Sequence, residues 1–400
     1  MKFGIIKERK NPPDRRVVFS PRDLQLLKTQ FPDAEISVER SDIRIFPDSE
    51  YAQLGFEVTD DVSHCDVLFG VKEVPVDALL ADKSYFFFSH TIKKQPYNRK
   101  LLQAVLQKNI TLYDHETIVD AENRRLIGFG RYAGIVGAYN GLRAFGIKFE
   151  LFNLPKAETL PGMDALVERL RRIVLPPLKI VVTGNGKVGQ GIVEILDAMK
   201  MKKVTPENFL TKLYSEPVYT QIDVLDYNRR IGGGSSTKTD FYNNPQLYES
   251  DFERFTKVSD IYMAGHFHGN GAPVILSREM LQAPDCKIKI VADVSCDVDG
   301  PIACTVRSST IAEPFYGYLA SEHKEVDMFH PAAVVVMSVD NLPCELPKDA
   351  SEGFGRMFIE HVIPAFFNGD RDGILARAKI TEAGKLTERF RYLQDYVDGK

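Results

Sequence analysis

Residues 179–196 read KIVVTGNGKVGQGIVEIL, and this stretch predicts a strand, a tight turn and a helix in direct succession. The apolar run at 180–182 suits the strand, and the apolar residues after the turn recur at helical spacing. Of the three spaced glycines, the first permits the turn, the second lets backbone approach a diphosphate, and the third lets helix and strand pack closely. The helix N-terminus attracts the phosphates. The alternative is a tight connection inside another kind of α/β domain. The predicted cofactor-binding residues are Gly184, Asn185, Gly186, Lys187, Val188 and Gly189.

The bulk properties exclude several classes of function. The 400 residues exceed the roughly 250–300 at which a single hydrophobic core stops growing, so we expect two domains. The formal net charge of -4 gives no support to binding of nucleic acid or of an anionic membrane. The N-terminus is charged where a signal peptide needs apolar residues, and no apolar run approaches the roughly 18 residues of a membrane span. We therefore expect a cytoplasmic protein.

Two buried strands in the first quarter of the chain each deliver a titratable side chain. The nearly continuous apolar run at 66–71 (DVLFGV) leads to Lys72, and the run at 85–89 (YFFFS) leads to His90. Parallel strands end at one sheet edge, where open α/β sheets place ligands, so these two residues are predicted to converge. A lone histidine there is more often structural, but a lysine on the neighbouring strand favours an acid–base pair. A third strand, at 110–113, is predicted next to them.

A cationic loop follows the first predicted strand, at residues 2–7. It contains Pro12 and Pro13, and then Arg15 and Arg16. These arginines are either ordinary surface charge or an anion clamp, because a guanidinium group can hold a carboxylate through two parallel hydrogen bonds.

The choice between NAD and NADP depends on the strand after the glycine loop. An acidic residue about 20 residues beyond the loop binds the adenosine ribose in NAD-dependent proteins. The strand that we expect there, at 209–213, ends without Asp or Glu. The cofactor is therefore predicted to be NAD or NADP. Residues 227–250, with glycines at 232–234, are predicted to form a mobile loop.

Other motifs are interpreted as structural. Gly130, Gly134 and Gly137 are predicted to be packing glycines of a helix, because no strand leads directly into them. His266 and His268 alternate as zinc ligands can, but no further cluster completes a site, and no metal is expected. The five cysteines are scattered without a CxxC pair and are interpreted as buried free thiols. Strands that alternate with helices throughout predict an α/β fold with parallel sheets.

An ordered series of motifs resembles the alanine dehydrogenase and saccharopine dehydrogenase superfamily, and most closely the lysine-forming saccharopine dehydrogenases. The resemblance covers nearly the whole chain. Its motifs are ERK…DRRVVFSP at 8–21, GVKE at 70–73, FFSH at 87–90, LYDHE at 112–116, RRLIGFGRYAG at 124–134, the glycine loop, VADVSCD at 291–297 and SVDNLPCELPKDAS at 338–351.

The resemblance implies two Rossmann-like domains in an alanine dehydrogenase-like arrangement. The substrate domain is expected to be discontinuous, with a first part at residues 1–133 and a return at 330–400. The dinucleotide-binding domain is expected to fill residues 134–329.

The resemblance also implies roles for residues that match its motifs. Lys72 and His90 match the acid–base pair of the family, and Arg16 matches its arginine for a substrate carboxylate. The other implied substrate-binding residues are Asp14, Glu73, Glu116 and Arg125. The other implied cofactor-binding residues, at the nicotinamide end, are Asp293, Asp340, Asn341 and Leu342.

The activity implied is the interconversion of saccharopine with lysine and 2-oxoglutarate by a nicotinamide-dependent oxidoreductase. Its partners are small molecules, and the sequence carries no indication of oligomeric state. The first alternative is an amino-acid dehydrogenase that uses ammonia and a 2-oxo acid, as alanine dehydrogenase does. The second is a regulatory protein that binds the cofactor without catalysis.

Overall fold

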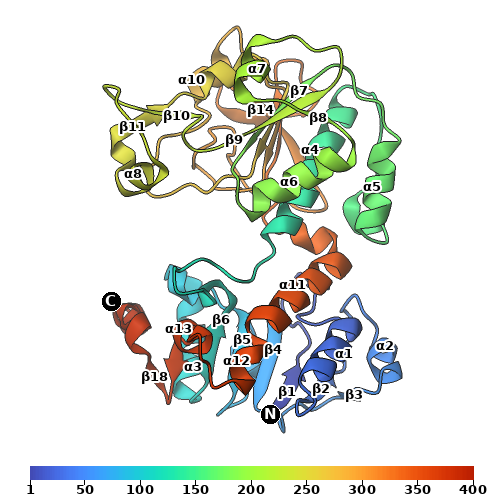
Figure 1. Cartoon of the computed structure of the whole chain (residues 1–400), viewed down its shortest axis with the longest axis vertical. Coiled ribbons are helices and arrows are strands. Elements are labelled where there is room, and N and C mark those ends of the chain that lie inside the picture. Colours follow the sequence, from blue (N-terminus) through green and yellow to red (C-terminus); the bar gives the residue numbers. More distant parts are fainter. The chain divides into compact units, whose positions relative to one another are not determined.

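The computed structural model describes all 400 residues, which separate into two compact units (Figure 1). Unit 1 comprises residues 1–129 and 347–400, and unit 2 comprises residues 130–346. Each unit is built of strands that alternate with helices, so the predicted α/β class is confirmed. Residues 334–337, which the sequence-based boundaries assign to the returning segment, form a strand in the sheet of unit 2.

Unit 1 contains a six-stranded sheet in which every neighbouring pair of strands is parallel. Its spatial order is β3-β2-β1-β4-β5-β6, so the chain reverses its direction of travel between β1 and β4. Ligands of open α/β sheets bind at such a switch point, beyond the carboxyl ends of the strands. The strands are β1 (Lys2–Ile5), β2 (Glu35–Glu39), β3 (Glu57–Thr59), β4 (Val67–Lys72), β5 (Ser84–Phe88) and β6 (Thr111–Asp114).

Helices cover both faces of this sheet because its central strands are apolar on both sides. In β5, Tyr85 and Phe87 pack into one core cluster, while Phe86 packs on the other face against Phe358 of α11. The side-chain alternation of a strand explains this division. The helices of unit 1 are α1 (Pro21–Gln30), α2 (Asp48–Gln53), α3 (Arg99–Gln107), α11 (Pro347–His361), α12 (Ile363–Phe367), α13 (Ile374–Ala378) and α14 (Gln394–Asp398), and a small hairpin joins β17 (Thr381–Glu382) and β18 (Lys385–Leu386).

Unit 2 contains an eight-stranded sheet of order β15-β14-β16-β13-β12-β7-β9-β8. Six strands are parallel, and β14 and β15 add an antiparallel edge, so this sheet is mixed. The strands are β7 (Lys179–Thr183), β8 (Lys202–Lys203), β9 (Val218–Ile222), β12 (Ile261–Ala264), β13 (Ile290–Asp293), β14 (Phe315–Leu319), β15 (Lys324–Val326) and β16 (Val334–Met337). The switch point lies between β7 and β12.

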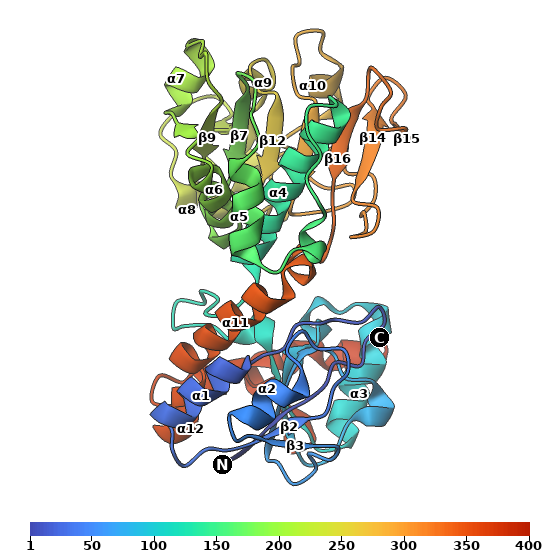
Figure 2. The same cartoon turned by 90° about the vertical axis from the view of Figure 1, so that its right-hand side faces the viewer.

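Three helices, α4 (Gly130–Lys148), α5 (Met163–Arg171) and α6 (Lys187–Ala198), lie along one face of the unit 2 sheet (Figure 2). Helices α4 and α6 approach so closely that a Cβ on Gly134 would lie 2.0 Å from the carbonyl oxygen of Val188. Gly137 is equally constrained by Val294, 2.3 Å from a hypothetical Cβ. The interpretation of these residues as packing glycines is confirmed. The opposite core contains residues of α7 (Pro206–Thr211), α9 (Glu253–Thr256) and α10 (Arg278–Gln282).

Two expectations for this unit are wrong. Residues 206–211 form helix α7, and the next main strand of the sheet is β9 at 218–222. The segment 227–250 is also not simply a loop: it contains β10 (Asn228–Arg230), α8 (Lys238–Asn243) and β11 (Tyr248–Ser250), and β10 pairs with β11. Phe241 and Tyr248 are buried in the core cluster and hold this segment in place. No helix of the chain has the length and apolar character that a membrane crossing requires.

Candidate active site and cofactor loop

Lys72 and His90 come from neighbouring strands at the carboxyl edge of the unit 1 sheet. Lys72 is the last residue of β4, and the strand register pairs it with Phe88, two residues before His90. A register irregularity between Phe69 and Lys72 marks the end of β4. The two titratable side chains predicted from the sequence therefore begin from adjacent positions of one sheet edge.

The backbone of His90 is held in the left-handed region by a buried carboxylate. Its φ is 54°, an unusual value for a residue with a side chain. The backbone N–H groups of Ser89 and His90 both donate to Oδ2 of Asp114, each at 2.9 Å. Asp114 is fully buried, and burial raises its pKa, while hydrogen bonds from the Ser89 hydroxyl and the Glu116 backbone N–H act to lower it. Asp114, which the sequence did not single out, thus fixes where the imidazole points.

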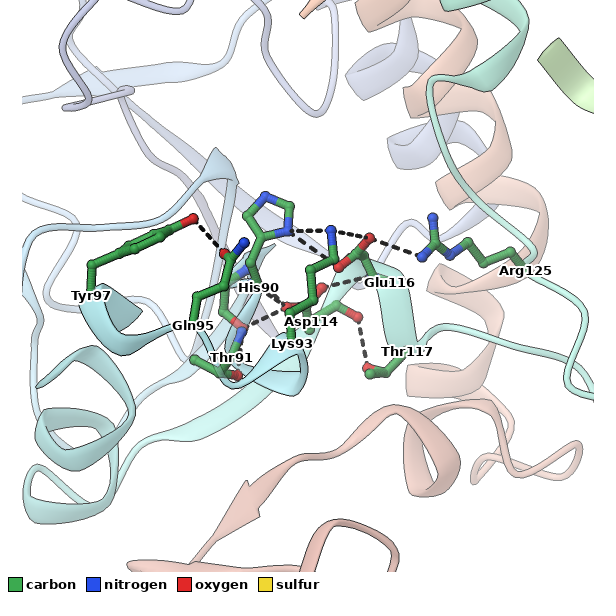
Figure 3. A network of polar contacts seen from close by, with 10 residues as sticks. His90, Thr91, Lys93, Gln95, Tyr97, Asp114, Glu116, Thr117 and Arg125 are labelled. Carbon is green, nitrogen blue, oxygen red and sulfur yellow. Dashed lines mark hydrogen bonds and ion pairs between the residues drawn. The ribbon is translucent and has the colours of Figure 1, made fainter. Parts of the chain in front are cut away.

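Glu116 is the centre of a polar network that includes His90 (Figure 3). Its carboxylate lies 3.2 Å from Nδ1 of His90, 3.3 Å from Nζ of Lys93 and 2.9 Å from a terminal nitrogen of Arg125. Burial acts to raise the pKa of Glu116, but the hydrogen bond from His90 and the two cations outweigh it and lower the pKa to about 2. Glu116 is therefore a carboxylate at any working pH. The ring edge that carries Nε2 of His90 points away from this network (Figure 3).

A second buried carboxyl group, that of Glu8, accepts hydrogen bonds from the backbone at the end of β4. Oε1 and Oε2 of Glu8 accept hydrogen bonds from the backbone N–H groups of Val71 at 2.7 Å and Lys72 at 2.8 Å. Burial raises the pKa of Glu8 to about 8. Glu8 follows β1, so it ties β4 to the strand on the other side of the switch point. In the sequence, Glu8 is recognisable only as a charged residue directly after an apolar strand, and nothing there indicates its partners.

Arg16 is bound to Asp14 through two parallel hydrogen bonds. Nε of Arg16 donates to Oδ1 of Asp14 at 3.0 Å, and a terminal nitrogen donates to Oδ2 at 2.6 Å. The Arg16 guanidinium also lies 4.2 Å from the ring centroid of Phe129. Burial acts to raise the pKa of Asp14, but the Arg16 charge and hydrogen bonds lower it to about 2, with a further contribution from the Lys72 charge. Both side chains are buried, so Arg16 is not ordinary surface charge.

Glu73 is the last predicted substrate-binding residue of unit 1, and it directly follows Lys72. Oε1 of Glu73 accepts from Nζ of Lys10 at 2.5 Å, whereas Oε2 is buried and has no hydrogen-bond partner. His115, the residue before Glu116, is structural. Its Nε2 forms a hydrogen bond with the Gly70 carbonyl oxygen at 2.8 Å, and burial lowers its pKa to about 3.

The glycine loop of unit 2 has the shape that a diphosphate needs. Gly184 has a φ of 95°, and a Cβ on Gly189 would lie 1.9 Å from the Gly184 carbonyl oxygen, so both positions require glycine. Gly186, in contrast, has open space where a Cβ would be. It directly precedes α6, whose first residue is Lys187. The backbone N–H groups at the start of this 12-residue helix, together with the open space beside Gly186, therefore fit a phosphate group.

Asp223 is the acidic residue that the sequence reading missed. It directly follows β9, the strand next to β7, and its Oδ2 accepts from Nδ2 of Asn185 at 2.8 Å. This is the place from which an Asp or Glu binds the adenosine ribose. The sequence reading looked for it after a strand at 209–213, and because the strand is in fact β9 at 218–222, it overlooked Asp223. The run VYTQID at 218–223 carried the signal.

The four residues assigned to the nicotinamide end have different environments. Asp293, at the end of β13, is fully buried: Oδ1 accepts from Oγ of Ser295 at 2.6 Å and Oδ2 from Oγ1 of Thr305 at 2.6 Å. It shapes the loop after β13. Leu342 is buried within unit 2, whereas Asp340 is exposed and Asn341 is half-buried.

His266 and His268 do not stand in a ligand cluster. Nδ1 of His266 lies 2.8 Å from Oγ1 of Thr183, and burial lowers the pKa of His266 to about 3. No group of three or more His, Cys, Asp or Glu side chains is arranged to hold a metal ion. All five cysteines are free, but only Cys65 and Cys304 are buried, so the burial expected for the other three is wrong.

Comparisons with known proteins agree with the resemblance stated from the sequence. Residues 4–136 match the family model "Alanine dehydrogenase/PNT, N-terminal domain". Among solved structures, an L-alanine dehydrogenase has the same fold, with a TM-score of 0.67 at 18% identity, covering 100% of this chain and 99% of that one.

Two curated relatives extend the similarity over most of the chain. The alpha-aminoadipic semialdehyde synthase of Arabidopsis thaliana is 27% identical over 98% of this chain, but the chain spans only 41% of that relative's length. The lysine-forming, NAD(+)-dependent saccharopine dehydrogenase of Neurospora crassa is 26% identical over 86% of both chains. The resemblance to saccharopine dehydrogenases and to the alanine dehydrogenase superfamily is confirmed.

Proposed function

We propose that this chain interconverts saccharopine with L-lysine and 2-oxoglutarate, using a nicotinamide cofactor. The observation that carries the proposal is the pair of titratable residues, Lys72 and His90, at one sheet edge, where a buried carboxyl group accepts the backbone N–H of each. The name of the Neurospora crassa relative, whose length this chain largely covers, supports the same reaction. The Arabidopsis thaliana relative is more than twice as long, so its own activities are not transferred here.

The reaction joins two substrates before reduction. The ε-amine of lysine attacks the ketone carbon of 2-oxoglutarate, water leaves, and an imine remains. Reduction of the imine carbon needs a hydride, which a nicotinamide cofactor held by the glycine loop would supply, and a proton on nitrogen then completes the secondary amine of saccharopine. In the opposite direction, Lys72 takes the proton of the secondary amine. His90 then moves protons during hydrolysis of the imine, with Glu116 orienting its ring; the two roles can also be exchanged.

Saccharopine carries three carboxylates, and the proposal assigns cations to them. Arg16 is the carboxylate-binding arginine implied by the family motif, and Asp14 keeps its guanidinium plane fixed. Lys72 and Arg125 supply further positive charge near the sheet edge. Glu73 and Glu116 balance these charges and orient the cations, as the contacts of Glu116 with Lys93 and Arg125 illustrate.

The residues of unit 2 fit the dinucleotide. The loop Gly184–Gly189 would hold the diphosphate, with Asn185, Lys187 and Val188 lining it, and Asp223 would bind the adenosine ribose. Asp293, Asp340, Asn341 and Leu342 are proposed for the nicotinamide end.

A screen of amine and oxo-acid pairs tests the proposal. The purified chain is mixed with NADH or NADPH and with lysine plus 2-oxoglutarate, ammonia plus pyruvate, or ammonia plus 2-oxoglutarate, and oxidation of the cofactor is followed by absorbance. We expect turnover that requires lysine and 2-oxoglutarate together. Turnover with ammonia and pyruvate instead would identify an alanine dehydrogenase-like enzyme, and cofactor binding without any turnover would identify a regulatory protein.

A further inference from the structure

Lys238 forms an ion pair with Asp223, the carboxylate next to the glycine loop. The pair is coupled to the loop itself, because Oδ2 of Asp223 also accepts from Nδ2 of Asn185 at 2.8 Å. Asp223 is mostly covered, with 21% of its side chain exposed, whereas Lys238 is 57% exposed. A cation therefore stands on the solvent side of the ribose-binding carboxylate.

The segment that carries Lys238 is folded and anchored. Lys238 is the first residue of α8, and Oγ1 of the preceding Thr237 caps this helix by accepting from the N–H of Asp240 at 3.0 Å. Asp240 in turn accepts from the hydroxyl of Tyr248 on β11 at 2.6 Å. Phe241 lies 5.1 Å from the Tyr248 ring and is buried in the core. Lys238 is thus positioned by a built structure between β10 and β11, although glycines with positive φ at 232–234 precede it.

The ion pair changes what the ribose site can accept. A lone carboxylate binds the two hydroxyls of an NADH ribose and repels the 2′-phosphate of NADPH, which is close to doubly charged at neutral pH. Lys238 neutralises the Asp223 charge and offers a donor to a phosphate oxygen. Asp226 and Tyr242 also face Lys238, and the Asp226 carboxylate accepts a hydrogen bond from the N–H of Asp223 at 2.7 Å.

We propose that Lys238 is a specificity-determining residue that lets this site take the 2′-phosphate of NADPH as well as the free ribose of NADH. Asp223 accepts hydrogen bonds from the ribose hydroxyls of NADH, and Lys238 donates to the 2′-phosphate of NADPH. The inference rests on the nicotinamide cofactor of the proposed function, but not on the identity of the amine or the oxo acid.

Direct binding tests the inference without any turnover. NADH and NADPH are titrated separately against the full chain and followed by the fluorescence of the reduced nicotinamide, at low and at moderate salt. We expect the wild-type chain to bind both cofactors within about tenfold of each other. Lys238→Ala should weaken NADPH about tenfold, equivalent to about 1.4 kcal/mol, and leave NADH within about threefold. The loss should shrink as salt rises, because the contact is electrostatic.

Two further variants make the test specific. Asp223→Ser should weaken NADH and leave NADPH the better ligand. Lys257→Ala is the matched control: Lys257 is also an exposed, ion-paired lysine of unit 2, 2.8 Å from Glu253, but it precedes β12 and so belongs to the amino edge of the sheet. It should change neither affinity.

An unchanged NADPH to NADH affinity ratio in Lys238→Ala overturns the inference. So does a wild-type chain that binds NADPH more than about a hundredfold more weakly than NADH. Failure of the saccharopine assay with both cofactors still bound would instead count against the proposed function alone.

Discussion

Oε2 of Glu116 lies 3.2 Å from Nδ1 of His90, and the backbone of His90 is fastened to Asp114, two residues before Glu116. One short segment after β6 therefore controls both the position and the ring orientation of the histidine. The left-handed backbone of His90 costs of the order of 1–2 kcal/mol, and the N–H donors to Asp114 help to offset it. Strain of this kind often accompanies a functional residue.

Replacement of His90 should remove proton transfer and keep cofactor binding. We expect His90→Ala to lower turnover of saccharopine by about 10²–10⁴-fold, because a positioned acid–base group contributes about that much. Stopped-flow and steady-state rates measure the loss, and NADH titration checks binding. His361→Ala, at the half-buried last residue of α11 in the same unit, is the control and should be as active as wild type. Near-normal turnover of His90→Ala would make the assigned role wrong.

Two substitutions of Lys72 separate charge from proton transfer. Lys72→Met removes both and should lower turnover by about 10²–10⁴-fold. Lys72→Arg keeps a positive charge but cannot release its proton near neutral pH, because guanidinium pKa values exceed about 12. Both variants should therefore be similarly impaired when kcat is compared. If Lys72→Arg recovered most of the activity, Lys72 would serve the substrate carboxylates only.

Glu8 should make the stability of the chain fall as pH rises. Its native pKa is about 8, mainly through burial, against 4.5 as the ordinary value. Between these pH values the native state holds a proton that the unfolded chain has released, so stability is highest below about pH 4.5 and is lost as pH passes 8. Denaturant unfolding of wild type and Glu8→Gln from pH 5 to pH 9 measures this. Over this pH range, the difference in free energy of unfolding between wild type and Glu8→Gln should shift against wild type by at least about 1.4 kcal/mol, the equivalent of one pKa unit. Parallel stability curves for the two proteins would show that Glu8 does not titrate in this window.

Alanine substitutions at two glycines of the cofactor loop should distinguish an effect on cofactor binding from an effect on folding. A Cβ at Gly186 meets no atom within 4 Å, and its φ of -77° suits alanine, so Gly186→Ala should fold normally. It should nevertheless weaken NADH by about tenfold or more, since the methyl group occupies the space proposed for the diphosphate. Gly189→Ala should instead lower the melting temperature, because its Cβ would lie 1.9 Å from a backbone oxygen. Equal NADH affinities of wild type and Gly186→Ala would place the diphosphate elsewhere.

Much of the fold could be predicted because apolar runs and glycine spacing are local signals. The strands predicted around 66–71 and 85–89, and the dinucleotide loop, appear where the sequence indicates them. The error at 209–213 came from its apolar residues, although Thr205 and Pro206 form a typical helix start with a capping side chain and a proline in the first turn. The misplaced strand then hid Asp223.

The tertiary partners of the site could not be read from the sequence. Glu8 meets residues 63 and 64 positions away, and Asp114 meets His90 across two strands. These contacts join the ends of neighbouring strands, β1 with β4 and β5 with β6, and hydrophobic patterns do not specify which strands are neighbours. The motif resemblance pointed to Glu116 and Arg125, but only the folded chain brings them together at 2.9 Å.

The most direct test of the central claim is the fate of the lysine ε-nitrogen. The chain is incubated with lysine labelled with ¹⁵N at the ε position, unlabelled 2-oxoglutarate and reduced cofactor, and the products are identified by mass spectrometry. We predict one product that contains both carbon skeletons joined through the labelled nitrogen. Its absence would contradict the account, whether lysine is not consumed or a parallel incubation with added ammonia forms glutamate instead.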